Sequence, residues 1–170
     1  IKMAESSKNE ELQREDEAKE EVGVSNDTTT PETMWERCFE LYLQARNGNK
    51  EAFDELEEIA KDQDIVCLGY FLILLDRTAE FADDHLFDET KQMIIDNVTT
   101  LISKSTSFEE FISNLTNKHQ QCIYSFIIEE GLGVEKNVDE AFRLCKLSAD
   151  QGHALAECIL GYYYQYGVGV

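Results

Sequence analysis

The cysteines and histidines are the residues of this chain whose side chains could take part in catalysis. Cys122 or Cys145 could act as a nucleophile with His119 as its base, because a thiolate beside an imidazole attacks acyl centres. Both cysteines fall on the apolar sides of expected helices, which is typical of inert thiols. The chain has neither the His-x-x-x-His nor the Glu-x-x-His spacing of a helical metal site, and it has no Cys-x-x-Cys pair. We therefore predict no catalytic residue, no metal and no cofactor, and expect that the chain is not an enzyme.

The cysteine count bears on the compartment. There are five cysteines, an odd number, each standing alone in an apolar run. We interpret them as small buried side chains in a reducing compartment, which favours a cytoplasmic protein. The alternative is the endoplasmic reticulum lumen or secretion, because Asn26, Asn97 and Asn114 each begin an Asn-x-Thr acceptor sequence for N-glycosylation.

Charge and hydropathy exclude two classes of partner. The formal net charge is -20, from 35 acidic and 15 basic residues, and this repels nucleic acid and anionic membranes. The pair Gly131 and Gly133 does not form a nucleotide loop, since Lys136 stands where the third glycine would be. The longest apolar run, residues 65–75, is shorter than the about 20 residues that cross a bilayer. We expect a protein partner with a basic surface, no nucleic acid and no membrane insertion.

The elements that carry these residues are predicted to be helices. Apolar residues recur at helical spacing, no segment alternates with period two, and the chain has a single proline. Pro31 suits a first helical turn, and Ser107 with Glu110 indicates a capping box. The expected helices run from Pro31 toward Gly48, over about 50–61, 65–75 and 86–102, from Ser107 to Leu115, from near Lys118, and over 138–151. The fold class is therefore all-α, with antiparallel helix pairs joined by short links.

An internal repeat occupies the C-terminal third of the chain. Gly131-Leu132-Gly133-Val134 recurs 36 residues later as Gly167-Val168-Gly169-Val170. In the helix between the two loops, Asn137 is expected to cap the start and Gly152 to end it. His153 occupies the polar position directly after Gly152 and is expected at the surface.

In these residues the chain resembles the Sel1-like repeat family, a relative of the tetratricopeptide repeats. The resemblance is specific over about residues 120–170 and implies a solenoid, a TPR-like superhelix of antiparallel helix hairpins. It also implies a role as a protein-protein interaction scaffold or adaptor. We expect Tyr164 and Phe142 to fill the space between helices and Gly161 to let helices approach closely. The positions that match the repeat pattern are Gly131, Gly133, Ala141, Gly152, Ala156, Leu160, Gly161, Tyr164, Gly167 and Gly169.

We divide the chain into three parts. Residues 1–29 are predicted to be an acidic tail that is disordered or a frayed helix, because few of their side chains are apolar. Residues 30–117 are expected to form degenerate helical hairpins or an N-terminal cap, and residues 118–170 the Sel1-like repeats. The last repeat is truncated at its glycine loop, and we expect a longer array. A regulatory or targeting module of a longer enzyme is therefore an alternative function.

The candidate partner-binding residues are Tyr162, Tyr163 and Tyr166. They surround Tyr164, which is expected in the core, and form a denser aromatic cluster than repeat packing needs. Aromatic side chains provide large contact areas at protein interfaces. The other interpretation is that these tyrosines pack on a helix that would follow Val170.

Overall fold

The computed structural model describes residues 30–78 and 83–169. The predicted tail over residues 1–29 and the acceptor residue Asn26 lie outside these ranges. Within them the chain forms eight helices and no strand, which confirms the all-α fold class. The helices are α2 (Pro31–Arg46), α3 (Lys50–Ala60), α4 (Ile65–Arg77), α5 (Asp84–Lys104), α6 (Phe108–Ser113), α7 (Lys118–Glu130), α8 (Val138–Asp150) and α9 (Ala154–Tyr166).

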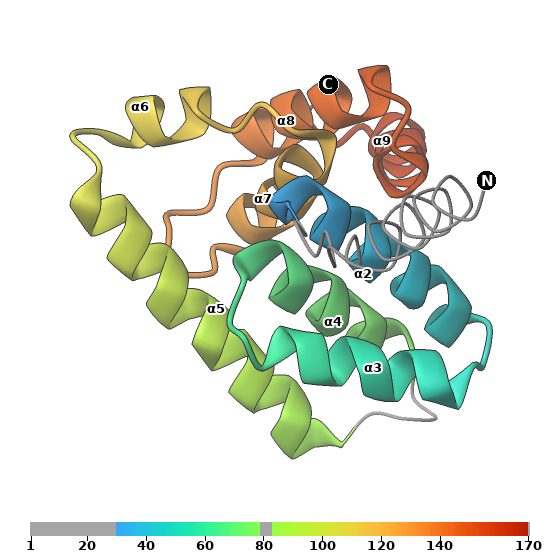
Figure 1. Cartoon of the computed structure of the whole chain (residues 1–170). Helices are drawn as coiled ribbons and strands as arrows, with labels where there is room; N and C mark the ends of the chain where they lie inside the picture. The colour runs from blue at the N-terminus through green and yellow to red at the C-terminus, as the bar shows by residue number, and fades with distance from the viewer. Residues whose placement is uncertain (1–29, 79–82, 170) are drawn as a thin grey trace, which may run out of the picture. The chain divides into compact units, whose positions relative to one another are not determined.

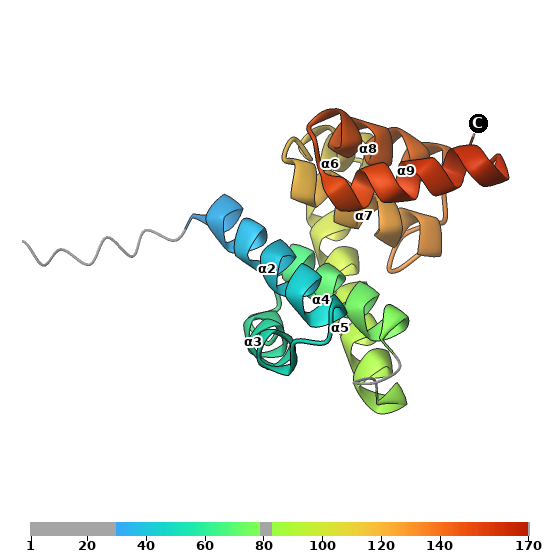
Figure 2. The ribbon, with the colours of Figure 1, turned by 90° about the vertical axis from the view of Figure 1, so that its right-hand side faces the viewer.

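The helices pack as consecutive hairpins. Helix α2 packs on α3, α4 on α5, and α7 on α8, which in turn packs on α9 (Figure 1, Figure 2). The first helices of successive hairpins also touch, since α2 packs on α4 and α4 on α7. The short helix α6 lies on the connection between α5 and α7 (Figure 1). This arrangement is a TPR-like helical-repeat fold, as expected.

Helix α4 is the centre of the packing. Every residue from Ile65 to Leu75 is buried, because α2, α3, α5 and α7 all pack against this helix. A helix without a polar face is stable in water only when neighbours cover it on all sides. No helix in the described part of the chain is long and apolar enough to span a membrane.

The contact between α4 and α7 is unusually close at Gly69. A Cβ atom at this position would overlap with the Cγ2 methyl of Ile123, and it would lie 3.2 Å from the Cδ1 atom of the same side chain. The missing side chain of Gly69 therefore makes room for Ile123, which is fully buried.

Several helices begin or end at the capping residues that we predicted from the sequence. The side chain of Asn137 accepts a hydrogen bond from the Glu140 backbone N–H at 3.0 Å and so caps α8. Ser107 accepts one from the Glu110 N–H at 3.1 Å and caps α6. Gly152, just after α8, has a φ of +77°, which an L side chain rarely adopts.

The two acceptor asparagines in the described residues differ in their surroundings. Asn97 lies within α5, and its side-chain amide donates to the backbone carbonyl of Gln63 at 3.3 Å. Asn114 follows α6 and is exposed. Asn114 is thus the more accessible of these two positions.

Candidate partner-binding surface

Helix α9 carries the aromatic cluster. His153 caps its first turn by accepting a hydrogen bond from the Ala156 N–H, and Gly167 ends it in a left-handed conformation. Successive side chains on a helix point about 100° apart, so neighbouring tyrosines cannot share an environment. Tyr162 is 53% exposed and Tyr166 is 61% exposed, whereas Tyr163 is fully buried.

The burial of Tyr163 corrects two sequence expectations. Tyr163 was expected with the exposed candidates, yet its hydroxyl donates to Glu129 Oε2 at 2.6 Å and its ring lies 5.9 Å from that of Phe142. Tyr164 was expected in the core, yet it is 57% exposed, and its ring meets that of Phe142 in a T-shaped contact. Ala156 and Tyr163 are both buried, and they are seven residues apart. Seven residues are about two helical turns, so both side chains lie on the same face of α9. Counting from Ala156 along the sequence would have selected Tyr163.

Tyr162 and Tyr166 form an exposed pair one helical turn apart. Their ring centroids lie 4.5 Å apart with an angle of 41° between the ring planes. Aromatic pairs in this geometry hold each other in place, so their faces are presented with little freedom to lose on binding. The two residues are on the surface, and their role in binding stays a prediction.

The two glycine loops are built in the same way. Gly131 ends α7 and Gly167 ends α9, each in the left-handed conformation. The second glycine of each loop lies close to a neighbouring element. A Cβ atom on Gly133 would lie 2.6 Å from the Ile95 carbonyl oxygen, and one on Gly169 would lie 2.8 Å from the Phe142 Cβ. The first glycine of each loop therefore turns the chain, and the second allows the loop to pack closely against the neighbouring helix.

The remaining positions of the repeat pattern divide into packed and open ones. Ala141 and Ala156 are fully buried, and the Cys145 thiol donates to the Ala156 carbonyl at 3.3 Å, so α8 and α9 are in close contact there. Leu160 is partly buried against the core. Gly161 was expected at a close approach, but it is exposed and no heavy atom lies within 4 Å of a Cβ built on it. Gly161 lies on the side of α9 that faces away from α8, so the expectation is wrong for the described residues.

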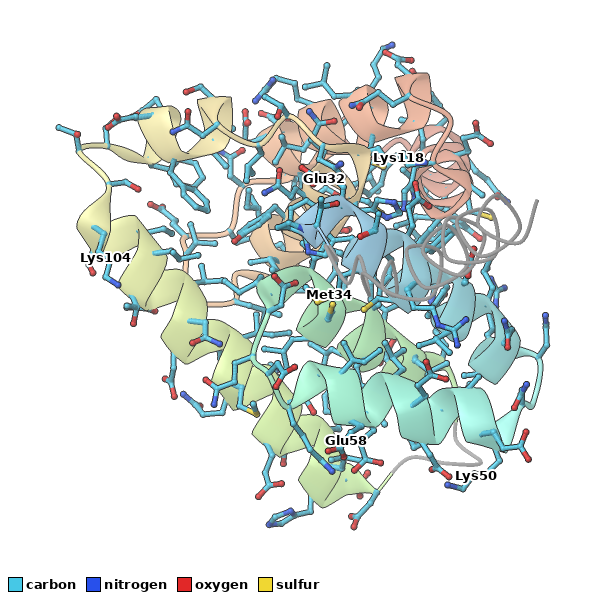
Figure 3. The ribbon with its side chains drawn as sticks, viewed as in Figure 1. Glu32, Met34, Lys50, Glu58, Lys104 and Lys118 are labelled. Carbon is cyan, nitrogen blue, oxygen red and sulfur yellow. The ribbon has the colours of Figure 1, made fainter. Side chains whose placement is uncertain are left out.

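Three side chains that are far apart in sequence meet in the interior. The Tyr70 hydroxyl lies 2.6 Å from His119 Nδ1 and 2.7 Å from His153 Nε2. His119 Nε2 lies 3.1 Å from the Glu36 carboxylate, which also pairs with Lys118 at 2.8 Å. Lys118, at the start of α7, extends toward α2 (Figure 3). We call Glu36, Tyr70, His119 and His153 the polar cluster; it joins α2, α4, α7 and the N-cap of α9.

One assignment of protons gives the contacts of the polar cluster a donor and an acceptor each. Because His153 Nδ1 accepts from the Ala156 N–H at 3.4 Å, the ring proton is on Nε2 and is donated to the Tyr70 oxygen. The Tyr70 hydroxyl donates in turn to His119 Nδ1, which leaves the His119 Nε2–H facing Glu36. Both histidines are neutral in this assignment, in agreement with their lowered pKa values. Burial is the main cause that lowers the pKa of both rings, to about 4 for His153.

The surface expectation for His153 is therefore wrong. The ring is 1% exposed, and it is buried because the side chains of Phe39, Tyr70 and His119 lie against it. His119 is equally buried, and burial raises the pKa of Cys122 and of Cys145, the latter to about 12. A substrate has no access to these groups, and protonated thiols are poor nucleophiles. Among the described residues, no group of three or more His, Cys, Asp or Glu side chains is arranged to hold a metal ion.

Comparison with protein families gives one assignment. The family model described as Sel1 repeat matches residues 121–153 and again residues 154–170. No curated protein and no solved structure matches the chain. The first match covers α7, its glycine loop and α8, and the second covers α9 and the loop that follows it. Residues 121–170 thus belong to the Sel1 repeat family, as both the matches and the equivalent glycine loops indicate.

Proposed function

We propose that the chain is a non-catalytic protein-interaction scaffold or adaptor in which α9 presents a binding surface. Sel1 repeats are generally protein-interaction modules and typically non-catalytic. The observation that supports this role most directly is the exposed aromatic pair of Tyr162 and Tyr166, which lie one helical turn apart on the same face of α9. Large exposed apolar side chains on a helix face commonly mark an interaction site.

A basic partner segment suits this surface best. The formal net charge of -20 attracts Lys and Arg residues at a distance, and exposed tyrosine rings bind such cations through their faces. The contribution is about 0.5–1 kcal/mol for each cation placed over an exposed ring. The tilted pair of Tyr162 and Tyr166 places two such rings next to each other. An acidic segment would be repelled by the same charge.

The hairpins that precede the matched repeats would support this surface. We propose that residues 30–117, which contain the α2/α3 and α4/α5 hairpins, are divergent repeats that serve as an N-terminal cap to residues 118–170. A helix hairpin cannot bury its apolar face alone, so neighbouring hairpins are needed for stability. The buried residues 65–75 of α4 would provide the apolar surface on which α7 packs.

A peptide selection tests the proposed function. A random peptide library is screened against the purified chain, and the affinity of selected peptides is measured by calorimetry for the wild type and for the double variant Tyr162→Ala/Tyr166→Ala. We expect selected peptides to be rich in Lys and Arg, and binding to weaken about tenfold or more in the double variant. Raising the salt concentration should weaken wild-type binding as well.

The matched control is Leu101→Ala, which removes an exposed apolar side chain from α5. This variant should bind the selected peptides as the wild type does, and circular dichroism should show that all proteins are folded. A selection without enrichment of basic residues, or equal loss of affinity in the control, would contradict the proposal.

A further inference from the structure

The sulfur atoms of Cys38 and Cys67 lie in direct contact in the interior. Cys38 belongs to α2 and Cys67 to α4, and their Sγ atoms are 2.6 Å apart. Both side chains are completely buried. A disulfide bond is about 2.05 Å long, so the two sulfurs need to move together by only about half an ångström to be bonded. We propose that Cys38 and Cys67 form a disulfide that ties α2 to α4 when the chain folds in the presence of a thiol oxidant.

The other cysteines have different surroundings. The Cys145 thiol is engaged with the Ala156 carbonyl, and Cys158 is exposed on α9. The odd cysteine count, which was interpreted as a sign of free thiols, therefore does not prevent one specific pair from bonding. Cys38 and Cys67 are 29 residues apart, and α3 lies between them in sequence. Their bond would close a loop around the first hairpin and link it to the second.

The chemistry is thiol–disulfide exchange with a small disulfide such as oxidised glutathione. One cysteine thiolate attacks a sulfur of the oxidant, forms a mixed disulfide and releases one glutathione thiolate. The second cysteine thiolate then attacks the chain's sulfur in the mixed disulfide, forms the Cys38–Cys67 bond and releases the second glutathione. Two electrons pass to the oxidant, and the two cysteine protons end on the two released thiols.

Burial determines when the exchange takes place. The contact with the Cys38 thiol, followed by burial, raises the pKa of Cys67, so its thiol is protonated in the folded protein. No oxidant reaches either sulfur while α2 and α4 are packed together. The exchange must therefore occur before this interface closes, and the finished bond is then shielded from reductants.

The experiment maps the bond by mass spectrometry. Reduced chain is unfolded in denaturant, refolded by dilution into oxidised glutathione, denatured again and alkylated without reduction. Trypsin then cuts after Arg37 and Lys61, among other sites, so the bond would join the peptide 38–46 to the peptide 62–77. We expect this linked pair as the main product, with Cys38 and Cys67 alkylated only after reduction. Cys158, which is exposed, is expected to take up glutathione instead.

Two variants give the controls. Cys122→Ala removes another buried cysteine and should leave the linked peptides unchanged, whereas Cys38→Ala should abolish them and make Cys67 available for alkylation. Alkylation of Cys38 and Cys67 in refolded wild-type protein before reduction would overturn the proposal, as would bonds between either of them and a different cysteine. Because the wild type is mapped after denaturation, this result does not depend on whether a variant folds.

A stability measurement gives an independent readout. Closing a loop of this length should raise the midpoint of thermal unfolding of the oxidised wild type by about 10 °C over the reduced protein. The Cys122→Ala variant should show the same difference between the two redox states. Equal midpoints for oxidised and reduced wild type would also count against the bond.

Discussion

Two glycine-to-alanine substitutions in helix interiors should have opposite effects on stability. Gly69 lies inside α4 and Gly161 inside α9. In an open helical position alanine is more favourable than glycine by about 0.5–1 kcal/mol, because glycine loses more backbone freedom on folding. Gly161 is open, with no atom within 4 Å of an added Cβ. Gly161→Ala should therefore stabilise the protein by about that amount.

At Gly69 the same gain is outweighed by a clash. The new methyl group would overlap with the Ile123 Cγ2 and lie 3.3 Å from the Ile123 Cβ, so α4 and α7 must separate or Ile123 must leave its rotamer. Overpacking a well-packed core costs about 1–3 kcal/mol. After the propensity gain of about 0.5–1 kcal/mol, the net loss is centred at about 1.2 kcal/mol and reaches at most about 2.5 kcal/mol. We expect a thermal midpoint roughly 2–6 °C lower for Gly69→Ala and roughly 1–3 °C higher for Gly161→Ala.

The assay is urea and thermal unfolding followed by circular dichroism for the wild type and both variants. A double-mutant cycle identifies the cause, because Ile123→Ala removes the methyl group that the new Cβ would meet. In that background Gly69→Ala should no longer be destabilising. If Gly69→Ala raises stability as Gly161→Ala does, or costs the same with and without the Ile123 side chain, the close approach of α4 and α7 is wrong.

Two further predictions concern buried polar groups. The folded-state pKa of His153 is about 4 against an ordinary value of 6.5, so its neutral form contributes stability that is complete above pH 6.5 and is lost as the pH falls toward 4. Urea unfolding over this range should show that the free energy of unfolding falls by up to about 3 kcal/mol. In His153→Asn, whose side chain can still cap α9, the free energy of unfolding should depend less on pH. An unchanged pH dependence in this variant would contradict the neutral polar cluster. Tyr163→Phe removes the donor to Glu129 and should lower the free energy of unfolding by about 1–2 kcal/mol. Tyr164→Phe, at an exposed position, is its control and should change stability little in the same unfolding assay.

Features that depend on a few neighbouring residues were predicted correctly. The caps at Ser107 and Asn137 and the turn at Gly152 each rest on residues at most three positions away, so the local pattern contains all of the interaction. The apolar run at residues 65–75 indicated a covered helix, and α4 is covered. Its neighbours could not be named in advance, because periodicity indicates that a face is buried but not what buries it.

The assignment of the tyrosines shows where a repeat pattern misleads. Tyr164 matches a position of the family pattern that we placed in the core, yet the face that α9 buries against α8 passes through Tyr163. The two residues point about 100° apart on the helix. An error of one position in the register therefore exchanges a buried side chain for an exposed one.

The sequence by itself determined the helices, their local caps and the left-handed turns at Gly131 and Gly167, because all of these arise from contacts within about one helical turn or one short loop. Only the tertiary structure decided which groups meet across the stacked hairpins. Tyr70 is 49 residues from His119 and 83 from His153, and Cys38 is 29 from Cys67. These distances along the chain are set by the lengths of intervening helices and links, and the angles at which the hairpins pack decide which side chains face one another. For that reason His119 and His153, whose spacing in the sequence matches no known motif, belong to one buried polar cluster in the fold.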